Sequence, residues 1–162
     1  KIMNELFNLQ LNHTTLIELA AQLGSDCPYF VYSEACLAKG RGEILQPIQC
    51  DLSNYSFTLI HPGIHVSTAW AFAQLKPHQK SKSIETIVQQ DIFTWKNELM
   101  NDFEKPIFEA HPILSELKEY LYQEGAIYAS MSGSGSSLFG IFPKGKTIQA
   151  PSFASHIRID HI

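Results

Sequence analysis

The first residue that could do chemistry is an aspartate in a short segment that we predict to be a tight turn, because it is rich in residues that end helices. Asp26 lies in Gly-Ser-Asp-Cys-Pro-Tyr-Phe, residues 24–30. If Pro28 holds the backbone rigid, the Asp26 carboxylate could accept a proton or orient a hydroxyl nucleophile. An aspartate between glycine and proline also commonly accepts hydrogen bonds from nearby backbone N–H groups in a turn. The residue type alone leaves both interpretations open.

A second candidate is a run of serines and glycines, Met-Ser-Gly-Ser-Gly-Ser-Ser, at residues 131–137. Glycines let a backbone approach a ligand closely, and the hydroxyl and N–H groups of such a run can bind the oxygens of an anion. The run lacks the ending of a Walker loop and the glycine spacing of a dinucleotide-binding loop. It also lacks the Gly-x-Ser-x-Gly elbow that presents a hydrolase nucleophile. A long hairpin turn is the alternative to a ligand loop.

Aromatic and histidine side chains give weaker indications. Trp70 and Phe72 lie in Thr-Ala-Trp-Ala-Phe, where they could be core residues or could offer a ring on which a base stacks. The seven histidines have no metal-ligand spacing, and His61 precedes Pro-Gly at the expected end of a strand. We therefore predict no metal site.

Composition narrows the class of protein. The chain has 162 residues, of which 44% are hydrophobic and 17% charged, with a formal net charge of −4. The hydrophobic share is that of a folded protein, and the absence of a basic stripe argues against nucleic-acid binding. No apolar run is long enough for a membrane span. Three cysteines without metal-ligand spacing fit the reduced thiols of a cytoplasmic protein: Cys27, Cys36 and Cys50.

The elements that must position these residues begin with two helices. Apolar residues recur at helical spacing in the first seven residues, and nothing before Lys1 caps this helix, so we expect a truncated chain or a preceding segment. Residues 15–18, Thr-Leu-Ile-Glu, form a capping-box pattern that predicts the start of the next helix. Gly24 predicts its end.

Strands and helices then follow in an order typical of an α+β fold with an antiparallel sheet and helices on one face. Alternating patterns predict strands, and apolar stripes predict helices. The predicted strands are short pieces of residues 31–46 around a turn at 39–42, residues 55–60, two arms of a hairpin within 126–142, and 154–162. The predicted helices are 68–75, a single helix at 84–99 and 112–125, with polar loops at 76–83 and 101–105 and no helix at 143–152.

These segments together resemble one family, the GHMP kinase superfamily of small-molecule kinases. The serine–glycine run alone would indicate only the superfamily. The Gly-Arg-Gly-Glu-Ile-Leu and His-Pro-Gly segments are similar to those of the members that phosphorylate a methylerythritol unit carrying a cytidine diphosphate group. The resemblance covers residues 1–143 and rests on segments that come in the same order: 24–30, 40–45, 61–63, 67–68, 83–86, 101–104 and 131–135.

The resemblance implies a kinase that uses ATP and Mg²⁺ in the non-mevalonate route to isoprenoid precursors. By this resemblance Asp26 is the catalytic carboxylate, which would take or orient the proton of the attacking hydroxyl. Arg41 and Phe72 match positions that line the cytidine pocket, and Thr68 lies nearby. The turn that borders the phosphates is matched by Ser132, Gly133, Ser134 and Gly135.

The same resemblance divides the chain into residues 1–53, the end of a ribosomal-S5-like domain, and residues 54–162, a ferredoxin-like C-terminal domain. The family's glycine- and serine-rich ATP loop lies before the position of Lys1, so we expect these 162 residues alone to be inactive. The expected partner is a small molecule with a cytidine diphosphate group, without nucleic acid or membrane, and the expected state is a monomer or homodimer. The alternatives are a kinase of homoserine or phosphomevalonate, or a non-catalytic binding module.

Overall fold

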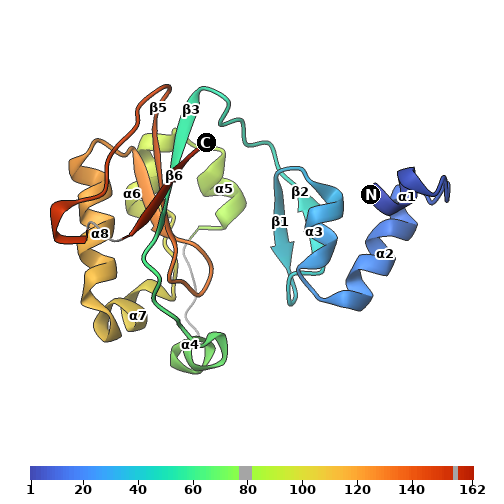
Figure 1. Ribbon diagram of the computed structural model, residues 1–162, viewed down its shortest axis with the longest axis horizontal. Helices are drawn as coiled ribbons and strands as arrows, with labels where there is room; N and C mark the ends of the chain where they lie inside the picture. Colours follow the sequence, from blue (N-terminus) through green and yellow to red (C-terminus); the bar gives the residue numbers. More distant parts are fainter. Residues whose placement is uncertain (77–81, 155–156) are drawn as a thin grey trace. The chain divides into compact units, whose positions relative to one another are not determined.

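A computed structural model describes residues 1–76, 82–154 and 157–162 of the chain (Figure 1). These residues form two units, Lys1–Cys50 and Asp51–Ile162. Helices dominate the start of the first unit, whereas a four-stranded sheet organises the second.

The first unit has three helices and a two-stranded hairpin. The elements are α1 (Ile2–Leu6), α2 (His13–Leu23), α3 (Cys27–Tyr32), β1 (Cys36–Lys39) and β2 (Ile44–Pro47). The strands β1 and β2 pair in antiparallel register around the turn predicted at 39–42. The helix predicted in the first seven residues is α1, and α2 ends before Gly24 as predicted.

The helix α2 begins earlier than the capping-box pattern predicts. Its N-cap is Asn12, whose Oδ1 accepts hydrogen bonds from the Thr15 N–H at 2.9 Å and from the Thr15 hydroxyl at 3.1 Å. Asparagine is a preferred N-cap residue, because its side chain satisfies a backbone N–H that has no intrahelical partner. The predicted capping box at residues 15–18 is therefore wrong, and Thr15 lies in the first turn of the helix.

The helix α3 occupies much of the segment predicted as a turn. The chain is helical from Cys27, and Pro28 lies in the first helical turn. Proline fits there because the N–H that it lacks would have no intrahelical acceptor. The turn prediction for residues 24–30 therefore holds only for 24–26.

The first unit buries little of its apolar surface. Among its residues, only Ala20 and Pro28 are buried. The large hydrophobic side chains that stay exposed are Ile2, Met3, Leu6, Phe7, Leu9, Leu19, Leu23, Tyr29, Phe30 and Ile44. Because burial of apolar surface is the main favourable term in folding, this unit gains little stability from a core of its own.

The second unit is built on an antiparallel sheet with the strand order β4-β5-β3-β6. Its strands are β3 (Tyr55–His61), β4 (Tyr128–Met131), β5 (Leu138–Pro143) and β6 (Arg158–His161). This is the order of a ferredoxin-like sheet, and the predicted α+β fold with an antiparallel sheet is confirmed. Between β5 and β6 the described residues contain a 3₁₀ turn, η1 (Ser152–Ala154), and no α-helix, in line with the prediction for 143–152.

The described part of this unit also contains α4 (Thr68–Gln74), α5 (Ile84–Val88), α6 (Ile92–Glu98), α7 (Glu104–Ala110) and α8 (Pro112–Gln123). The helices predicted at 68–75 and 112–125 are α4 and α8. The single helix predicted at 84–99 is wrong, because the chain leaves the helical conformation after Val88. The Asp91 side chain accepts a hydrogen bond from the Phe93 N–H at 3.0 Å and so caps a new helix, α6.

The helix α7 begins inside the segment predicted as a polar loop. It starts at Glu104 and includes Pro106 as its third residue. The first four N–H groups of a helix have no intrahelical acceptor, so proline at this position removes no helical hydrogen bond. The loop predicted at 101–105 therefore ends at Phe103.

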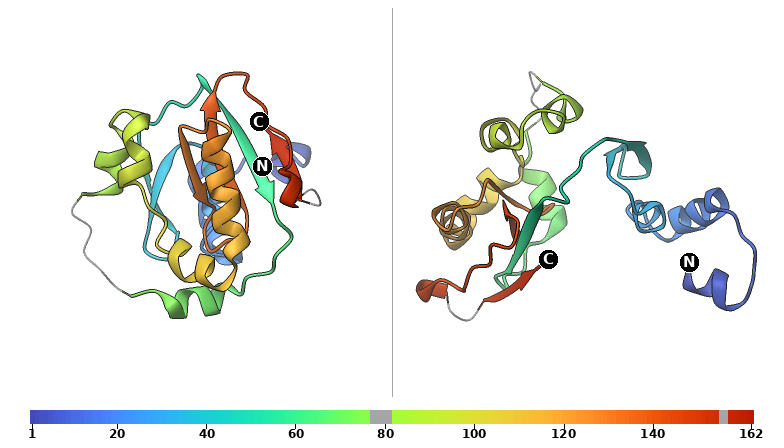
Figure 2. Two further views of the ribbon diagram at one scale, coloured as in Figure 1. Left: turned by 90° about the vertical axis from the view of Figure 1, so that its left-hand side faces the viewer. Right: turned by 90° about the horizontal axis from the view of Figure 1, so that it is seen from above.

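The helix α8 packs on one face of the sheet, against β4 and β5 (Figure 2). Its apolar stripe is fully buried and consists of Leu114, Leu117 and Leu121. The stripe belongs to a cluster with sheet residues that share one face: Ile60, Ala129, Met131, Leu138 and Phe142. Gly140 lies on the same face, and a Cβ there would lie 2.7 Å from Cε2 of Phe142 and 3.0 Å from Cδ2 of Leu121. The close packing of α8 on β5 therefore needs a residue without a side chain at position 140.

The other face of β4 meets α6. The rings of Trp95 and Tyr128 pack edge to face with their centroids 5.8 Å apart, and the Tyr128 hydroxyl donates a hydrogen bond to the Leu99 carbonyl oxygen at 2.9 Å. Burial raises the pKa of Tyr128 to about 12, because the charged form would lose its hydration. Tyr128 therefore stays a protonated hydrogen-bond donor at neutral pH.

Two predicted elements fall partly outside the described residues. The loop predicted at 76–83 includes 77–81, and the strand predicted at 154–162 includes 155–156. Within the described part of that last segment, β6 is a strand as predicted. Across the residues that the structure describes, we find no helix with the length and apolar character needed to cross a membrane.

We predict that Gly140→Ala lowers the free energy of unfolding of the chain by about 1–3 kcal/mol, because the added methyl group overlaps the fully buried side chains of Phe142 and Leu121, which must shift within the core. Urea denaturation followed by circular dichroism measures this change. Gly24→Ala is the matched control, since that backbone is extended and an added Cβ would meet its nearest atom at an ordinary 3.4 Å. Equal losses in the two variants would contradict the packing of α8 on β5.

Candidate functional site

In the first unit, the Asp26 carboxylate lies against the turn between β1 and β2. Gly42 in this turn has a φ of +116°, and a Cβ added to it would collide with Asp26 Oδ1. Only glycine combines this backbone conformation with such a close approach. The turn that contains Arg41 is therefore packed on Asp26 through Gly42.

The Asp26 side chain is exposed and makes no hydrogen bond or ion pair with any residue that the structure describes. In particular, it does not cap α3, although it immediately precedes that helix. The interpretation of Asp26 as a residue that stabilises a turn by accepting backbone hydrogen bonds is therefore not supported. A carboxylate with free oxygens is what a proton acceptor requires.

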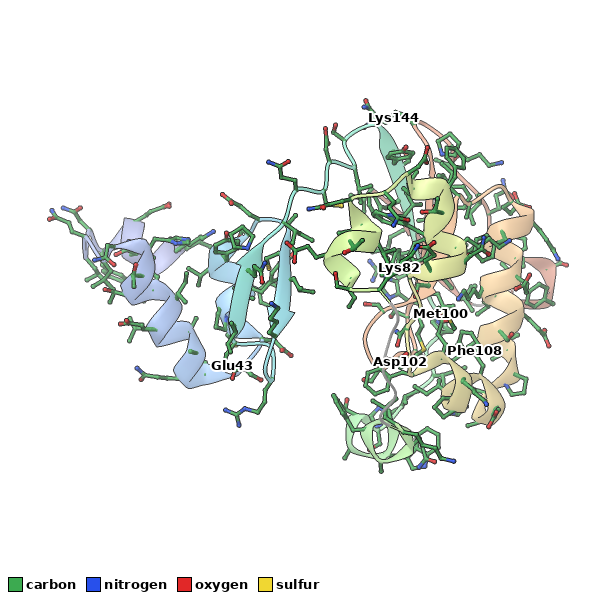
Figure 3. The ribbon with its side chains drawn as sticks, turned by 180° about the vertical axis from the view of Figure 1, so that it is seen from behind. Glu43, Lys82, Met100, Asp102, Phe108 and Lys144 are labelled. Carbon is green, nitrogen blue, oxygen red and sulfur yellow. The ribbon has the colours of Figure 1, made fainter. Side chains whose placement is uncertain are left out.

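Glu43 holds the same turn in shape (Figure 3). Its Oε2 accepts a hydrogen bond from the Arg41 N–H at 2.6 Å, and its carboxylate lies so close to Gly40 that a Cβ there would be 2.8 Å from Oε1. Hydrogen bonds from its own N–H and from the Arg41 N–H lower the pKa of Glu43, because they stabilise the charged form. Sequence reasoning did not single out Glu43, although it is part of the Gly-Arg-Gly-Glu segment.

In the second unit, two predicted segments that are far apart in the chain lie together. Thr68 is the first residue of α4, which Ser67 caps by accepting a hydrogen bond from the Trp70 N–H at 3.4 Å. The Thr68 hydroxyl is hydrogen-bonded to the Ser134 hydroxyl at 3.3 Å. The start of α4 therefore adjoins the serine–glycine turn, the name used below for residues 132–137.

The ring of Phe72 lies one turn further along α4 and is 60% exposed. One of its edges contacts the ring of Phe103, with the centroids 5.0 Å apart and the planes at 78°. A core residue would be covered on all sides, so the core interpretation does not hold for Phe72. The exposed ring is positioned by its neighbour and is open to a flat ligand.

The serine–glycine turn closes the hairpin between β4 and β5. The Ser132 N–H donates to the Ser137 carbonyl oxygen at 2.8 Å, and the Gly135 N–H donates to the Ser132 carbonyl oxygen at 2.9 Å. The Ser136 hydroxyl donates to the carbonyl oxygen of Ile64, and the Ser137 hydroxyl is hydrogen-bonded to His61 Nδ1 at 3.2 Å. The run is thus a hairpin turn, and its ties to the segment between β3 and α4 fix its place.

Asn101 and Glu104 form hydrogen bonds with the backbone of β4 where it enters this turn. Neither was singled out as a site residue from the sequence. Asn101 Nδ2 donates to the carbonyl oxygens of Met131 and Gly133, each at 2.8 Å. Glu104 Oε1 accepts the Met131 N–H at 2.9 Å and the Ser130 hydroxyl at 3.1 Å. Figure 3 labels Met100 and Asp102, which flank Asn101 in the segment between α6 and α7. The only feature of the sequence that pointed to Asn101 and Glu104 was the segment Asn-Asp-Phe-Glu, residues 101–104.

In the described part of the chain, no metal centre coincides with these residues. Among the described residues, no group of three or more histidine, cysteine, aspartate or glutamate side chains could hold a metal ion. An open cavity lies beside α8, lined by Tyr120, Glu124 and residues 147–153, and it contains none of the predicted site residues.

We predict that Lys118→Met lowers the free energy of unfolding by about 2–3 kcal/mol. Lys118 Nζ lies 2.6 Å from Glu104 Oε2, and the two side chains are only 21% and 13% exposed, so the substitution leaves a largely buried carboxylate without its counter-charge. Lys146→Met is the control, since Lys146 and Glu124 are 3.9 Å apart and half-exposed, and such a pair contributes about 0–1 kcal/mol. Thermal or urea unfolding compares them, and similar losses would contradict a special role for Glu104.

Comparison with known proteins points to one family. Residues 83–152 match a family model described as GHMP kinases C terminal. Curated proteins named 4-diphosphocytidyl-2-C-methyl-D-erythritol kinase are similar over most of the chain. The one from Bacteroides fragilis is 44% identical over 153 residues, which are 94% of this chain and 56% of the relative. The one from Nitratidesulfovibrio vulgaris is 34% identical over 159 residues, which are 92% of this chain and 56% of the relative.

The chain thus spans about half the length of the curated relatives that it matches. Among solved structures, a crystal structure of 4-(cytidine 5'-diphospho)-2C-methyl-D-erythritol kinase aligns with a TM-score of 0.72 and 26% identity over 86% of this chain and 51% of that chain. A homoserine kinase from Cytophaga hutchinsonii aligns with a TM-score of 0.61 and 17% identity over 99% and 60%, and shares the fold. Residues 83–152 thus match the C-terminal domain of the GHMP kinases, and most of the chain is similar to curated proteins that are named as kinases.

Proposed function

We propose that this chain is part of a small-molecule kinase that transfers a phosphoryl group from ATP to a hydroxyl group of 4-diphosphocytidyl-2-C-methyl-D-erythritol. The observation that supports this best is the hydrogen bond between Thr68 and Ser134, which joins a helix with an exposed aromatic ring to a turn of serines and glycines. Relatives at 34–44% identity bear the name of this activity. The product would belong to the non-mevalonate route to isoprenoid precursors.

The roles follow from what each group can do. Asp26, with its free carboxylate, would accept or orient the proton of the attacking hydroxyl. Phe72 would stack on the cytosine base with Thr68 nearby, and Arg41 would contact the cytidine group. The backbone of the serine–glycine turn, Ser132 to Gly135, would face phosphate oxygens. Phosphoryl transfer needs positioning and charge neutralisation more than covalent help from the protein, and these groups would position the substrate.

ATP would be the donor, and Mg²⁺ is the cation that phosphoryl transfer from ATP ordinarily uses. Because the described residues offer no cluster of metal ligands, we assign no Mg²⁺ ligand in this chain. In the same proposal the first unit completes a ribosomal-S5-like domain, the second is the ferredoxin-like C-terminal domain, and the protein works in the cytoplasm as a monomer or homodimer.

There are two alternatives to this function: a related kinase that acts on another substrate, and a related protein without catalytic activity. The chain could serve a kinase of homoserine or phosphomevalonate, since the fold alone also matches a homoserine kinase. It could also belong to a binding module without catalysis. A panel of alcohol substrates separates these cases, because only the favoured function requires a cytidine diphosphate group on the acceptor.

We predict that Asp26→Asn lowers kcat by about 100-fold or more in the protein encoded by the complete gene, because the amide cannot accept the hydroxyl proton. Coupled detection of ADP release with the cytidine-bearing alcohol as acceptor measures the rate. Asp91→Asn is the control, since asparagine preserves the cap of α6 and removes a carboxylate from a residue outside the site. Unchanged kcat in Asp26→Asn would remove Asp26 from the mechanism.

We also predict that Phe72→Ala raises KM for the cytidine-bearing substrate by about 5- to 150-fold and leaves KM for ATP unchanged, because one aromatic–base stack contributes about 1–3 kcal/mol. Phe93→Ala is the matched control, a phenylalanine on another short helix with 67% of its surface exposed. Steady-state kinetics with each substrate varied in turn provides both constants. Equal effects of the two substitutions would speak against base stacking on Phe72.

A further inference from the structure

One side chain engages two backbone carbonyl oxygens where β4 enters the serine–glycine turn. Asn101 uses its whole amide: Nδ2 donates to the carbonyl oxygens of Met131 and Gly133, and Oδ1 accepts the Phe103 N–H at 2.9 Å. The acceptor on one side and the two donated bonds on the other fix the orientation of the amide group. Asn101 is half-buried, so these bonds are partly shielded from water.

In this turn the carbonyl oxygens of Ser132, Gly133 and Ser137 are engaged, whereas several of its N–H groups are not. Asn101 takes the Met131 and Gly133 oxygens, and the Gly135 N–H takes that of Ser132. The N–H groups of Gly133, Ser134 and Ser136 have no hydrogen-bond partner among the residues that the structure describes. Consecutive free N–H groups in a turn form a concave patch of positive potential, which suits an anion.

The other ties of the turn do not have this effect. The bonds to Thr68, Ile64 and His61 all run through the hydroxyl groups of Ser134, Ser136 and Ser137, so they hold the turn in place without engaging its carbonyl oxygens.

We propose that Asn101 is a positioning residue that makes the serine–glycine turn a binding surface for phosphate oxygens by holding the carbonyl dipoles of Met131 and Gly133 away from them. The inference rests on the proposed function and extends it, because it gives a role at the turn to Asn101, which was not among the predicted site residues. The phosphate oxygens can come from the nucleotide donor or from the diphosphate of the acceptor substrate. Separate KM values for these two substrates tell the two sources apart.

The test is Asn101→Asp in the protein encoded by the complete gene. The carboxylate has the size of the amide and keeps the acceptor for the Phe103 N–H, but it places an oxygen where Nδ2 faced two carbonyl oxygens. Asn97→Asp is the matched control, because it makes the same chemical change at an exposed position of α6. Leu114→Ala is a second control, since it destabilises a fully buried position and so reports what loss of stability alone does to the kinetics.

Steady-state kinetics well below the melting temperatures gives the two KM values. We expect Asn101→Asp to raise KM about tenfold or more for the substrate whose phosphate oxygens bind the turn. The KM of the other phosphate-bearing substrate should change by no more than about twofold. Both controls should leave both constants near the wild-type values. A loss that is equal for both substrates, or no larger than in Leu114→Ala, would assign Asn101 a structural role only and overturn the proposal.

A binding experiment on the 162-residue chain does not depend on catalysis. Titration with inorganic pyrophosphate should shift the backbone amide resonances of Gly133 and Ser134, and Asn101→Asp should weaken this binding about tenfold relative to Asn97→Asp. If the wild-type chain binds pyrophosphate at the turn but the complete protein phosphorylates no alcohol, the proposed function fails and the role of Asn101 stands. Equal binding by the two variants would overturn the role of Asn101 whatever the enzyme does.

Discussion

The backbone of Met131 is held at both of its polar groups by one short segment of the chain. Glu104 accepts its N–H, and Asn101 donates to its carbonyl oxygen. Lys118 of α8 offsets the charge of Glu104 at 2.6 Å, so the end of β4, the start of α7 and the middle of α8 are joined in one network. The serine–glycine turn begins at the next residue, and its geometry therefore depends on these hydrogen bonds to the Met131 backbone. A largely buried carboxylate is stable here because every element around it supplies a donor or a counter-charge.

The two units differ in how they achieve order. The second has a continuous apolar cluster between α8 and the sheet, closed at Gly140 by direct contact of helix and strand. The first has two buried residues and many exposed apolar ones, and its local geometry depends on polar and steric details: the cap at Asn12, the carboxylate of Glu43, and Gly42 against Asp26. The carboxylate proposed for catalysis thus lies in the unit with little core, whereas the turn proposed for phosphate lies in the well-packed one.

Periodicity predicted most elements because it reports burial directly. The stripe on α8 and the loose alternation of β3 each follow from one buried face. The errors arose where a single side chain decided a boundary: Asn12 in place of Thr15, Asp91 inside an apolar stripe, and Pro106 tolerated in a first turn. For the site, the sequence indicated Asp26, Phe72 and the serine–glycine turn by residue type. It marked Asn101 and Glu104 only as part of the segment 101–104 and gave them no role, because their contacts are made with residues about 30 positions away in the chain.

The strand order has a consequence for how the second unit is made. β3 is synthesised first of its four strands, yet both of its neighbours in the sheet, β5 and β6, come from the far end of the chain, and the hydroxyl of Thr58 bonds His161 across 103 positions. Such non-local pairing closes large loops and slows folding. During translation, β3 must leave the ribosome with both hydrogen-bonding edges open. Until the last described strand emerges, the nascent chain presents an unpaired strand, the kind of edge that chaperones shield from association with other chains.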